Sequence, residues 1–138
     1  METIKTDQKA ILSTLWIFAT LNYLYCDIMG LMDANFLKQY LTGTVNGMSM
    51  NENFLLGAAI LMEIPIAMVL FSRILKYKAN RWANISAGII MTLVQTATLI
   101  AGSPTKYYLF CSIFEIATTI FIVWFAVKWN EKKNNSVV

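Results

Sequence analysis

Two glutamates interrupt otherwise apolar stretches of this sequence: Glu63 in ILMEIPIAMVL, residues 60–70, and Glu115 in YLFCSIFEIATTIFIV, residues 108–123. A carboxyl group in apolar surroundings can hold and release a proton, or bind a cation. The amides of Asn22 and Gln95 stand in similar apolar runs. These four side chains are the sequence's candidates for a ligand- or proton-binding site.

The remaining composition excludes several familiar kinds of site. The chain has no histidine, the commonest general base and metal ligand, which argues against zinc sites and histidine-assisted nucleophilic catalysis. Its two cysteines form no Cys-x-x-Cys motif, and its basic residues do not form a patch with interleaved aromatics. We therefore predict no catalytic residue, metal site or cofactor, and no nucleic-acid partner.

The balance of apolar and charged residues indicates a membrane protein. Apolar residues make up 57% of the 138 residues and charged residues only 14%, whereas soluble domains carry about 25% charged residues. About 20 apolar residues are needed to cross the hydrocarbon layer as a helix. Four segments qualify, at about 10–29, 54–71, 82–101 and 107–127. The fold class predicted for 1–138 is a single all-α domain, an antiparallel bundle of four transmembrane helices.

Basic residues gather on one side of these spans. Cytoplasmic loops are enriched in lysine and arginine, so both termini are expected to be cytoplasmic. Nine of the 11 basic residues fall on that side: Lys5, Lys9, Arg73, Lys76, Lys78, Arg81, Lys128, Lys132 and Lys133. Only Lys38 and Lys106 fall on the other side. The lipid bilayer is thus an expected partner.

The long connection 30–51 has a structure of its own. Asp33 is of a residue type that favours the N-cap position of a helix. After it, Phe36, Leu37, Tyr40 and Leu41 fall on one helical face, which predicts a short amphipathic helix on the membrane surface. It would act as an interfacial linker or as a lid over a cavity. The following stretch, GTVNGMSMN, is expected to be flexible.

The depth of the polar residues suggests a common site. A rise of about 1.5 Å per residue places Glu63 and Glu115 roughly 12–14 Å below the outer face, with Asn22 and Gln95 near the same level. Small or polar residues flank them at helical spacing, so we expect these side chains to face inward. Tyr23 and Asp27 would line the outer mouth. The alternative is a structural hydrogen-bond cluster that holds the helices in register.

Close carboxyl groups in a membrane cannot readily both ionise. We therefore expect a shared proton, hydrogen bonds to Asn22 and Gln95, or a bound cation to offset the cost. Pro65 removes a backbone donor and bends its helix beside Glu63, which favours a local widening. Cys26 and Cys111 also fall at similar depth, about 6 Å below the outer face. They could lie close together, but two independent small apolar side chains are the preferred interpretation.

Several short motifs resemble an uncharacterised family of small bacterial four-helix integral membrane proteins. The first helix is similar to that family through Leu15, Trp16, Tyr23, Tyr25, Asp27, Gly30 and Leu31; the second through EIPIAMVLFSRIL; the third through Asn80, Arg81, Trp82, Asn84 and Ile85; and the fourth through Tyr108, Phe110, Glu115, Ile122, Ala126 and Trp129. The resemblance implies the four-helix architecture and the bacterial inner (cytoplasmic) membrane, and implies no reaction. Any likeness to DoxX-like membrane proteins is one of architecture alone.

Three functions remain open at this point. The first is binding or transport of a small apolar or cationic ligand at Glu63 and Glu115, with proton coupling and a homodimer forming the path. The second is a structural or accessory subunit of a larger membrane complex. The third, less favoured, is an intramembrane enzyme acting on a lipid or isoprenoid with one carboxyl as acid and another as base.

Overall fold

Four long helices and one short helix make up the computed structural model, which describes residues 7–130. Of the basic residues used to predict orientation, Lys5, Lys132 and Lys133 lie outside this range. The long helices are α1 (Gln8–Met32), α3 (Glu52–Ile74), α4 (Tyr77–Ala101) and α5 (Lys106–Lys128). All four are long and apolar enough to cross a membrane. The predicted fold class is confirmed, and each helix extends one to five residues beyond the predicted span at one or both ends.

Short polar residues cap the starts of α1, α3 and α5, whereas α4 begins after Lys76 without a side-chain cap. Asp7 accepts a hydrogen bond from the Lys9 backbone N–H, Asn51 from that of Phe54, and Thr105 from that of Tyr108. Such caps satisfy donors that have no partner within the helix. Gly102-Ser103-Pro104 then separates α4 from α5 and forces the two helices to run antiparallel.

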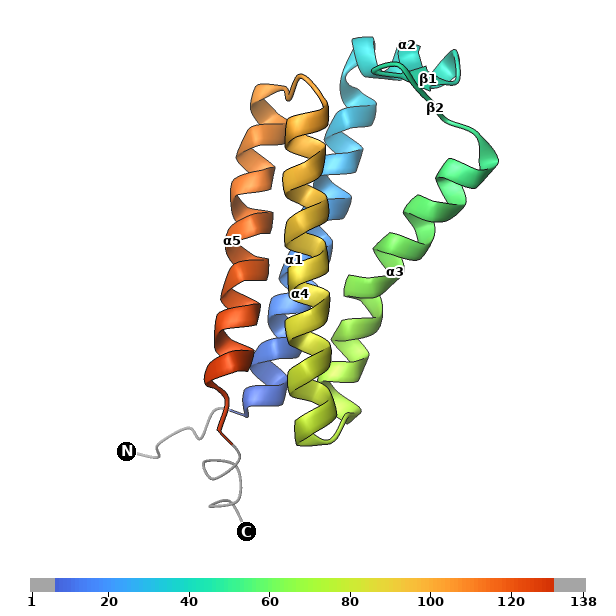
Figure 1. The fold of residues 1–138 in the computed structure, drawn as a ribbon. Helices are drawn as coiled ribbons and strands as arrows, with labels where there is room; N and C mark the ends of the chain where they lie inside the picture. Colours follow the sequence, from blue (N-terminus) through green and yellow to red (C-terminus); the bar gives the residue numbers. More distant parts are fainter. Residues whose placement is uncertain (1–6, 131–138) are drawn as a thin grey trace.

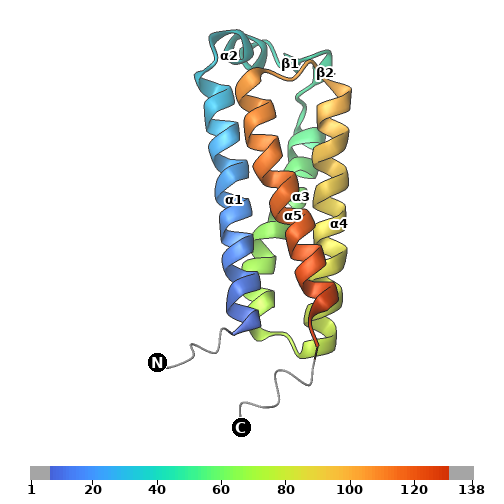
Figure 2. The ribbon, with the colours of Figure 1, turned by 90° about the vertical axis from the view of Figure 1, so that its left-hand side faces the viewer.

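Around the bundle the order is α3, α1, α5, α4 (Figure 2). Helix α1 begins and α5 ends at the same end of the bundle, here called the terminal end (Figure 1). The opposite end is called the hairpin end. A stripe of buried α1 residues, Leu12, Trp16, Ala19 and Tyr23, packs against the other helices. Their spacing of three or four residues is that of one helical face.

Helix α3 joins the bundle only through its half nearer the terminal end. Its buried residues are Pro65, Met68 and Ser72, whereas residues 52–60 are all exposed. Figure 1 shows α3 leaning away from the other helices toward the hairpin end. The core at the hairpin end is therefore built by α1, α4 and α5.

The connection between α1 and α3 contains the predicted short helix, α2 (Ala34–Leu41), capped by Asp33. The strands β1 (Thr44–Val45) and β2 (Met48–Ser49) follow as an antiparallel hairpin, where the sequence suggested only a flexible segment. Asn46 and Gly47 have φ angles of 49° and 80°. Positive φ at both central residues is the geometry of the tight turns that Asn-Gly favours.

Large apolar side chains remain exposed on the outward faces of the long helices, including Leu21 at 58%, Ile60 at 63% and Leu93 at 63%. Soluble monomers rarely expose such continuous apolar surface. Together with helix length, this surface is compatible with a multi-pass membrane protein.

Candidate functional site

A hydrogen-bonded network ties α1, α3 and α4 together in the half of the bundle nearer the terminal end. Trp16 donates from Nε1 to Asn84 Oδ1 at 2.7 Å, and Ser72 Oγ donates to the same oxygen at 3.2 Å. Asn84 Nδ2 donates to Asn80 Oδ1 at 2.7 Å, and Asn80 Nδ2 donates to the Ser72 carbonyl oxygen at 2.6 Å. All four side chains are buried. Since their polar groups are paired, this network is suited to fixing helix register rather than to holding a ligand.

Glu115, on α5 in the hairpin-end half, differs from that network. It is 1% exposed, and neither of its carboxyl oxygens has a hydrogen-bond partner among residues 7–130. Buried polar groups in proteins are nearly always hydrogen-bonded. Glu115 therefore presents a carboxyl group inside the bundle with free capacity to bind a proton or a cation.

Two groups on α1 interact electrostatically with Glu115, as does Tyr108 on α5. Tyr23 and Asp27 both interact electrostatically with Glu115. Tyr23 is 6% exposed, and its hydroxyl oxygen also lacks a hydrogen-bond partner within the described part of the chain. Asp27 is exposed, one turn closer to the hairpin end. The predicted site residues Tyr23, Asp27 and Glu115 thus come together between α1 and α5.

Two cysteines belong to the same region. Cys26 on α1 and Cys111 on α5 are both buried and free, and they interact electrostatically across the interface between their helices. The sequence favoured two independent small side chains over a close pair. Both thiols are free, as two separate side chains would be, and their interaction places them on facing sides of α1 and α5.

Gln95 is buried as predicted but has a different partner. Its Nε2 donates to Ser112 Oγ at 2.8 Å and, at the limit of 3.5 Å, to Tyr108 Oη. Tyr108 Oη in turn donates to Thr98 Oγ1 at 2.7 Å. These bonds hold α4 to α5, so the expected hydrogen bond from Gln95 to an acid is not formed.

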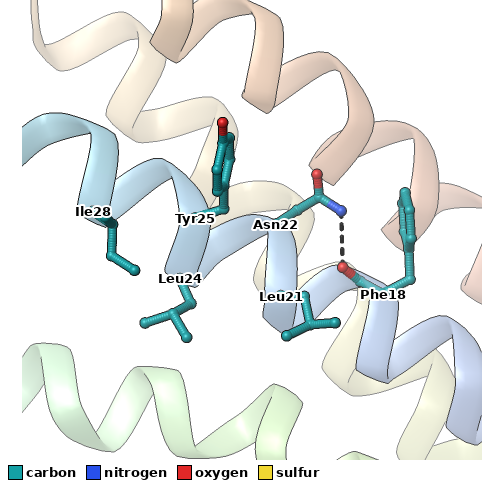
Figure 3. Close-up of a pocket in the computed structure, with 6 residues that line it drawn as sticks. All are labelled: Phe18, Leu21, Asn22, Leu24, Tyr25 and Ile28. Atoms are coloured by element: carbon teal, nitrogen blue, oxygen red, sulfur yellow. Dashed lines mark hydrogen bonds between the residues drawn. The ribbon is translucent and has the colours of Figure 1, made fainter.

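Asn22 faces a groove on the surface of α1 rather than a site shared by four helices. Its Nδ2 donates to the Phe18 backbone oxygen one turn earlier, at 2.8 Å. Figure 3 shows both groups in this groove, which has a volume of about 450 Å³. The groove is lined by Phe18, Leu21, Asn22, Leu24, Tyr25 and Ile28. The expected hydrogen bond between Asn22 and a glutamate is therefore absent from these described residues.

Glu63 is exposed on α3, and the expectation that it faces the interior is wrong. Pro65 is buried instead. Because successive helical residues are rotated by about 100°, side chains two positions apart point in nearly opposite directions. The inward position of Pro65 thus directs Glu63 outward. The acidic partner of Glu115 is Asp27 on α1, not Glu63.

Helix α2 lies over the hairpin end of α1 (Figure 1). Tyr40 on α2 interacts electrostatically with Asp27 and with Tyr107 at the start of α5. The short helix is therefore placed beside the hairpin ends of α1 and α5. Within residues 7–130 no group of three or more cysteine or acidic side chains could hold a metal ion.

The chain belongs to a family of unknown function, DUF6326, whose family model matches residues 2–136. This agrees with the resemblance seen in the sequence to an uncharacterised family. Neither the curated proteins nor the solved structures include a significant match.

Proposed function

We propose that this protein resides in the bacterial inner membrane with both termini in the cytoplasm, and that it binds a small cationic, otherwise apolar ligand at Glu115 in exchange for a proton. The proposal rests on one observation: a fully buried carboxyl group whose two oxygens have no hydrogen-bond partner among the described residues.

Burial without a partner determines the resting state of Glu115. An isolated ionised carboxylate is very costly in a medium of low dielectric constant, and the group becomes neutral instead. Glu115 is therefore protonated in the closed bundle. A bound cation would compensate the carboxylate charge directly, so binding of the cation and release of the proton are coupled.

Asp27 and Tyr23, both on α1, define the path by which the ligand would approach Glu115. At about 1.5 Å per residue, Asp27 lies roughly 8 Å from the end of α1 and Glu115 roughly 14 Å from the start of α5. Asp27 would attract a cation at the mouth. The unpartnered hydroxyl group of Tyr23 lies deeper, where it can bond to the ligand or to the carboxylate. Helix α2 covers this mouth as a lid.

Proton release on addition of a lipophilic cation tests the exchange. Purified protein in weakly buffered detergent is mixed with tetraphenylphosphonium, and a pH-indicating dye reports released protons. Wild type is expected to release a proton and to bind the cation more weakly as the pH falls. Glu115→Gln, which keeps the shape but cannot ionise, is expected to do neither, while Glu63→Gln behaves as wild type. Equal proton release by Glu115→Gln and wild type would contradict the proposal.

Glu63 favours a second function, that of an accessory subunit in a larger membrane complex. A carboxyl group facing lipid near the middle of a bilayer costs roughly 2.5–3.5 kcal/mol on insertion scales. The neighbouring α3 residues 52–60 are exposed as well. A partner helix with a hydrogen-bond donor would relieve this cost.

A photo-crosslinking amino acid in place of Glu63 tests this second function in intact membranes. The matched control replaces Leu93, which is exposed to 63% on α4. A crosslink to one distinct protein from position 63 and none from position 93 would support the subunit role. A crosslink between two copies of this chain would indicate a homodimer. Crosslinks to lipid alone would contradict both the subunit role and the homodimer.

A further inference from the structure

The neighbouring helices α4 and α5 (Figure 2) have a groove between them that opens on the outer surface of the bundle. Its volume is about 280 Å³, and it is lined by Ile89, Thr92, Leu93, Ile120, Val123 and Trp124. The Thr92 hydroxyl group is hydrogen-bonded to the Gly88 carbonyl oxygen at 2.7 Å and to Thr119 Oγ1 at 2.8 Å. Because this hydroxyl group is used inside the helix interface, the groove presents an almost entirely apolar wall.

Two basic side chains lie at the end of this groove nearer the terminal end of the bundle. Lys128, the last residue of α5, places Nζ 4.3 Å from the centre of the Trp124 ring, which is one wall of the groove. Arg81 on α4 donates from Nη2 to the Val127 carbonyl oxygen at 2.9 Å, and so reaches the same turn of α5. A guanidinium group has five N–H donors, so Arg81 keeps donors for a further partner. Both cations therefore flank one end of the groove.

Helical spacing connects these cations to the groove. The residues of α4 that run from its basic start into the groove recur every three or four positions, and so share one face: Lys78, Arg81, Ile85, Ile89 and Thr92. At about 1.5 Å per residue, Trp124 lies roughly 6 Å along α5 from Lys128, and Ile120 roughly 12 Å. Half of the hydrocarbon layer is about 15 Å thick. The groove thus has the length and position of an acyl chain whose head group lies at the cations.

Acidic side chains are scarce at this end of the bundle. Among residues 7–130, Asp7 is the one acidic residue at the terminal end, and it caps α1 rather than α4 or α5. The charges of Arg81 and Lys128 are therefore available to an external anion. Basic pockets between transmembrane helices bind anionic lipid head groups. A ligand that matches both the cations and the apolar wall carries a negative head group and a hydrocarbon chain.

We propose that an anionic phospholipid binds between α4 and α5, with its phosphate group at Arg81 and Lys128 and one acyl chain in the groove beside Trp124. A zwitterionic phospholipid brings an ammonium group toward the same two cations, so it binds more weakly. The site shares no residue with the proposed exchange at Glu115. Each proposal can therefore fail without the other.

Native mass spectrometry of the delipidated full chain, titrated with dioleoyl phosphatidylglycerol or dioleoyl phosphatidylcholine, measures this preference. Wild type is expected to bind phosphatidylglycerol at least tenfold more tightly. Arg81→Gln and Lys128→Gln should each weaken its binding about fivefold, the effect of one basic residue near an anionic surface. The matched control Lys76→Gln removes the same charge just before α4, outside the groove, and should change the affinity less than twofold. Equal binding of the two lipids by wild type, or equal losses in all three variants, would contradict the proposal.

A bulky side chain tests the groove without changing the charge. Ile120→Trp fills part of the groove and is expected to weaken phosphatidylglycerol binding at least fivefold. Ile113→Trp is the matched control, because residue 113 is also exposed on α5, at 66%, but does not line the groove. It should bind as wild type does. Thermal unfolding in lipid-free detergent checks that each variant is folded. Wild-type affinity in folded Ile120→Trp would exclude the groove as the acyl-chain site.

A photo-crosslinking amino acid at position 120 identifies the occupant in intact membranes. Phosphatidylglycerol is expected among its adducts in excess of its share of the membrane lipid, whereas the same amino acid at position 113 should capture lipids in proportion to their abundance. Capture of a second copy of the chain, or of another protein, from position 120 would show a protein contact at the groove and overturn the proposal.

Discussion

Glu115 on α5 and Asp27 on α1 interact electrostatically across the interface between their helices. Tyr23, Cys26 and Cys111 share this interface. The side chains with chemical potential therefore gather between two neighbouring helices at the hairpin end of the bundle. Helix α3, which supplies Glu63, leans away from them at this end.

Gly88 allows α4 and α5 to approach closely. A Cβ atom at this position would lie 2.6 Å from Val123 Cγ2 and 3.3 Å from the Thr119 carbonyl oxygen. Gly88→Ala is therefore expected to destabilise the bundle by about 1–3 kcal/mol, the usual cost of overpacking. Thermal unfolding in detergent measures the change.

Gly57 on α3 gives the matched control, because a Cβ atom there would meet nothing within 4 Å. Gly57→Ala is expected to leave stability unchanged or to raise it slightly, since alanine is the better helix former. An equal loss of stability in Gly57→Ala and Gly88→Ala would contradict the close approach of α4 and α5 at Gly88.

The Asn84 side chain is the centre of the network at the terminal end. Asn84→Leu would leave the Trp16 Nε1 hydrogen and the Ser72 hydroxyl without their acceptor. Since unsatisfied buried donors cost about 1–3 kcal/mol, we expect a lower unfolding temperature in detergent. Trp16→Phe removes one donor and leaves Asn84 Oδ1 bonded to Ser72. The hydrogen-bond energy lost in Trp16→Phe should therefore be smaller than that lost in Asn84→Leu. An unchanged unfolding temperature in Asn84→Leu would mean that the network contributes no stability.

The orientation expected from the lysine and arginine distribution can be checked by labelling. In a background of Cys26→Ala and Cys111→Ala, one cysteine is introduced at Asn46 in the hairpin or at Lys76 between α3 and α4. A membrane-impermeant maleimide applied to spheroplasts, which lack the outer barrier, should label position 46 at once and position 76 only after lysis. The reverse pattern would place the termini outside the cytoplasm.

The number, order and approximate limits of the helices could be predicted from the sequence, because length and hydropathy determine them. The inward direction of Glu115 could also be predicted. Its helical neighbours Cys111, Ser112, Thr118 and Thr119 are small or polar, and all four are buried with it. Because several positions on the same helical face as Glu115 are small or polar, they all indicated that this face points inward.

The direction of Glu63 could not be predicted in the same way. Its neighbours Ala59 and Ala67 are small, but small residues suit a face toward any partner, inside or outside the bundle. What decides the direction is that α3 packs through Pro65, Met68 and Ser72 and leaves its first half free. That choice depends on the shapes of the other three helices. The partners of Gln95 were likewise missed, because depth along the membrane says nothing about the side of a helix.

The state of Glu115 is the central claim, and infrared difference spectroscopy tests it most directly. A protonated carboxyl group has a C=O stretching band that separates from the bands of ionised carboxylates. In lipid at neutral pH, wild type and Glu63→Gln should both show a protonated-carboxyl band that disappears when tetraphenylphosphonium binds, and Glu115→Gln should lack that change. A cation-induced change that persists in Glu115→Gln, or that is lost in Glu63→Gln instead, would contradict the assignment of the site to Glu115.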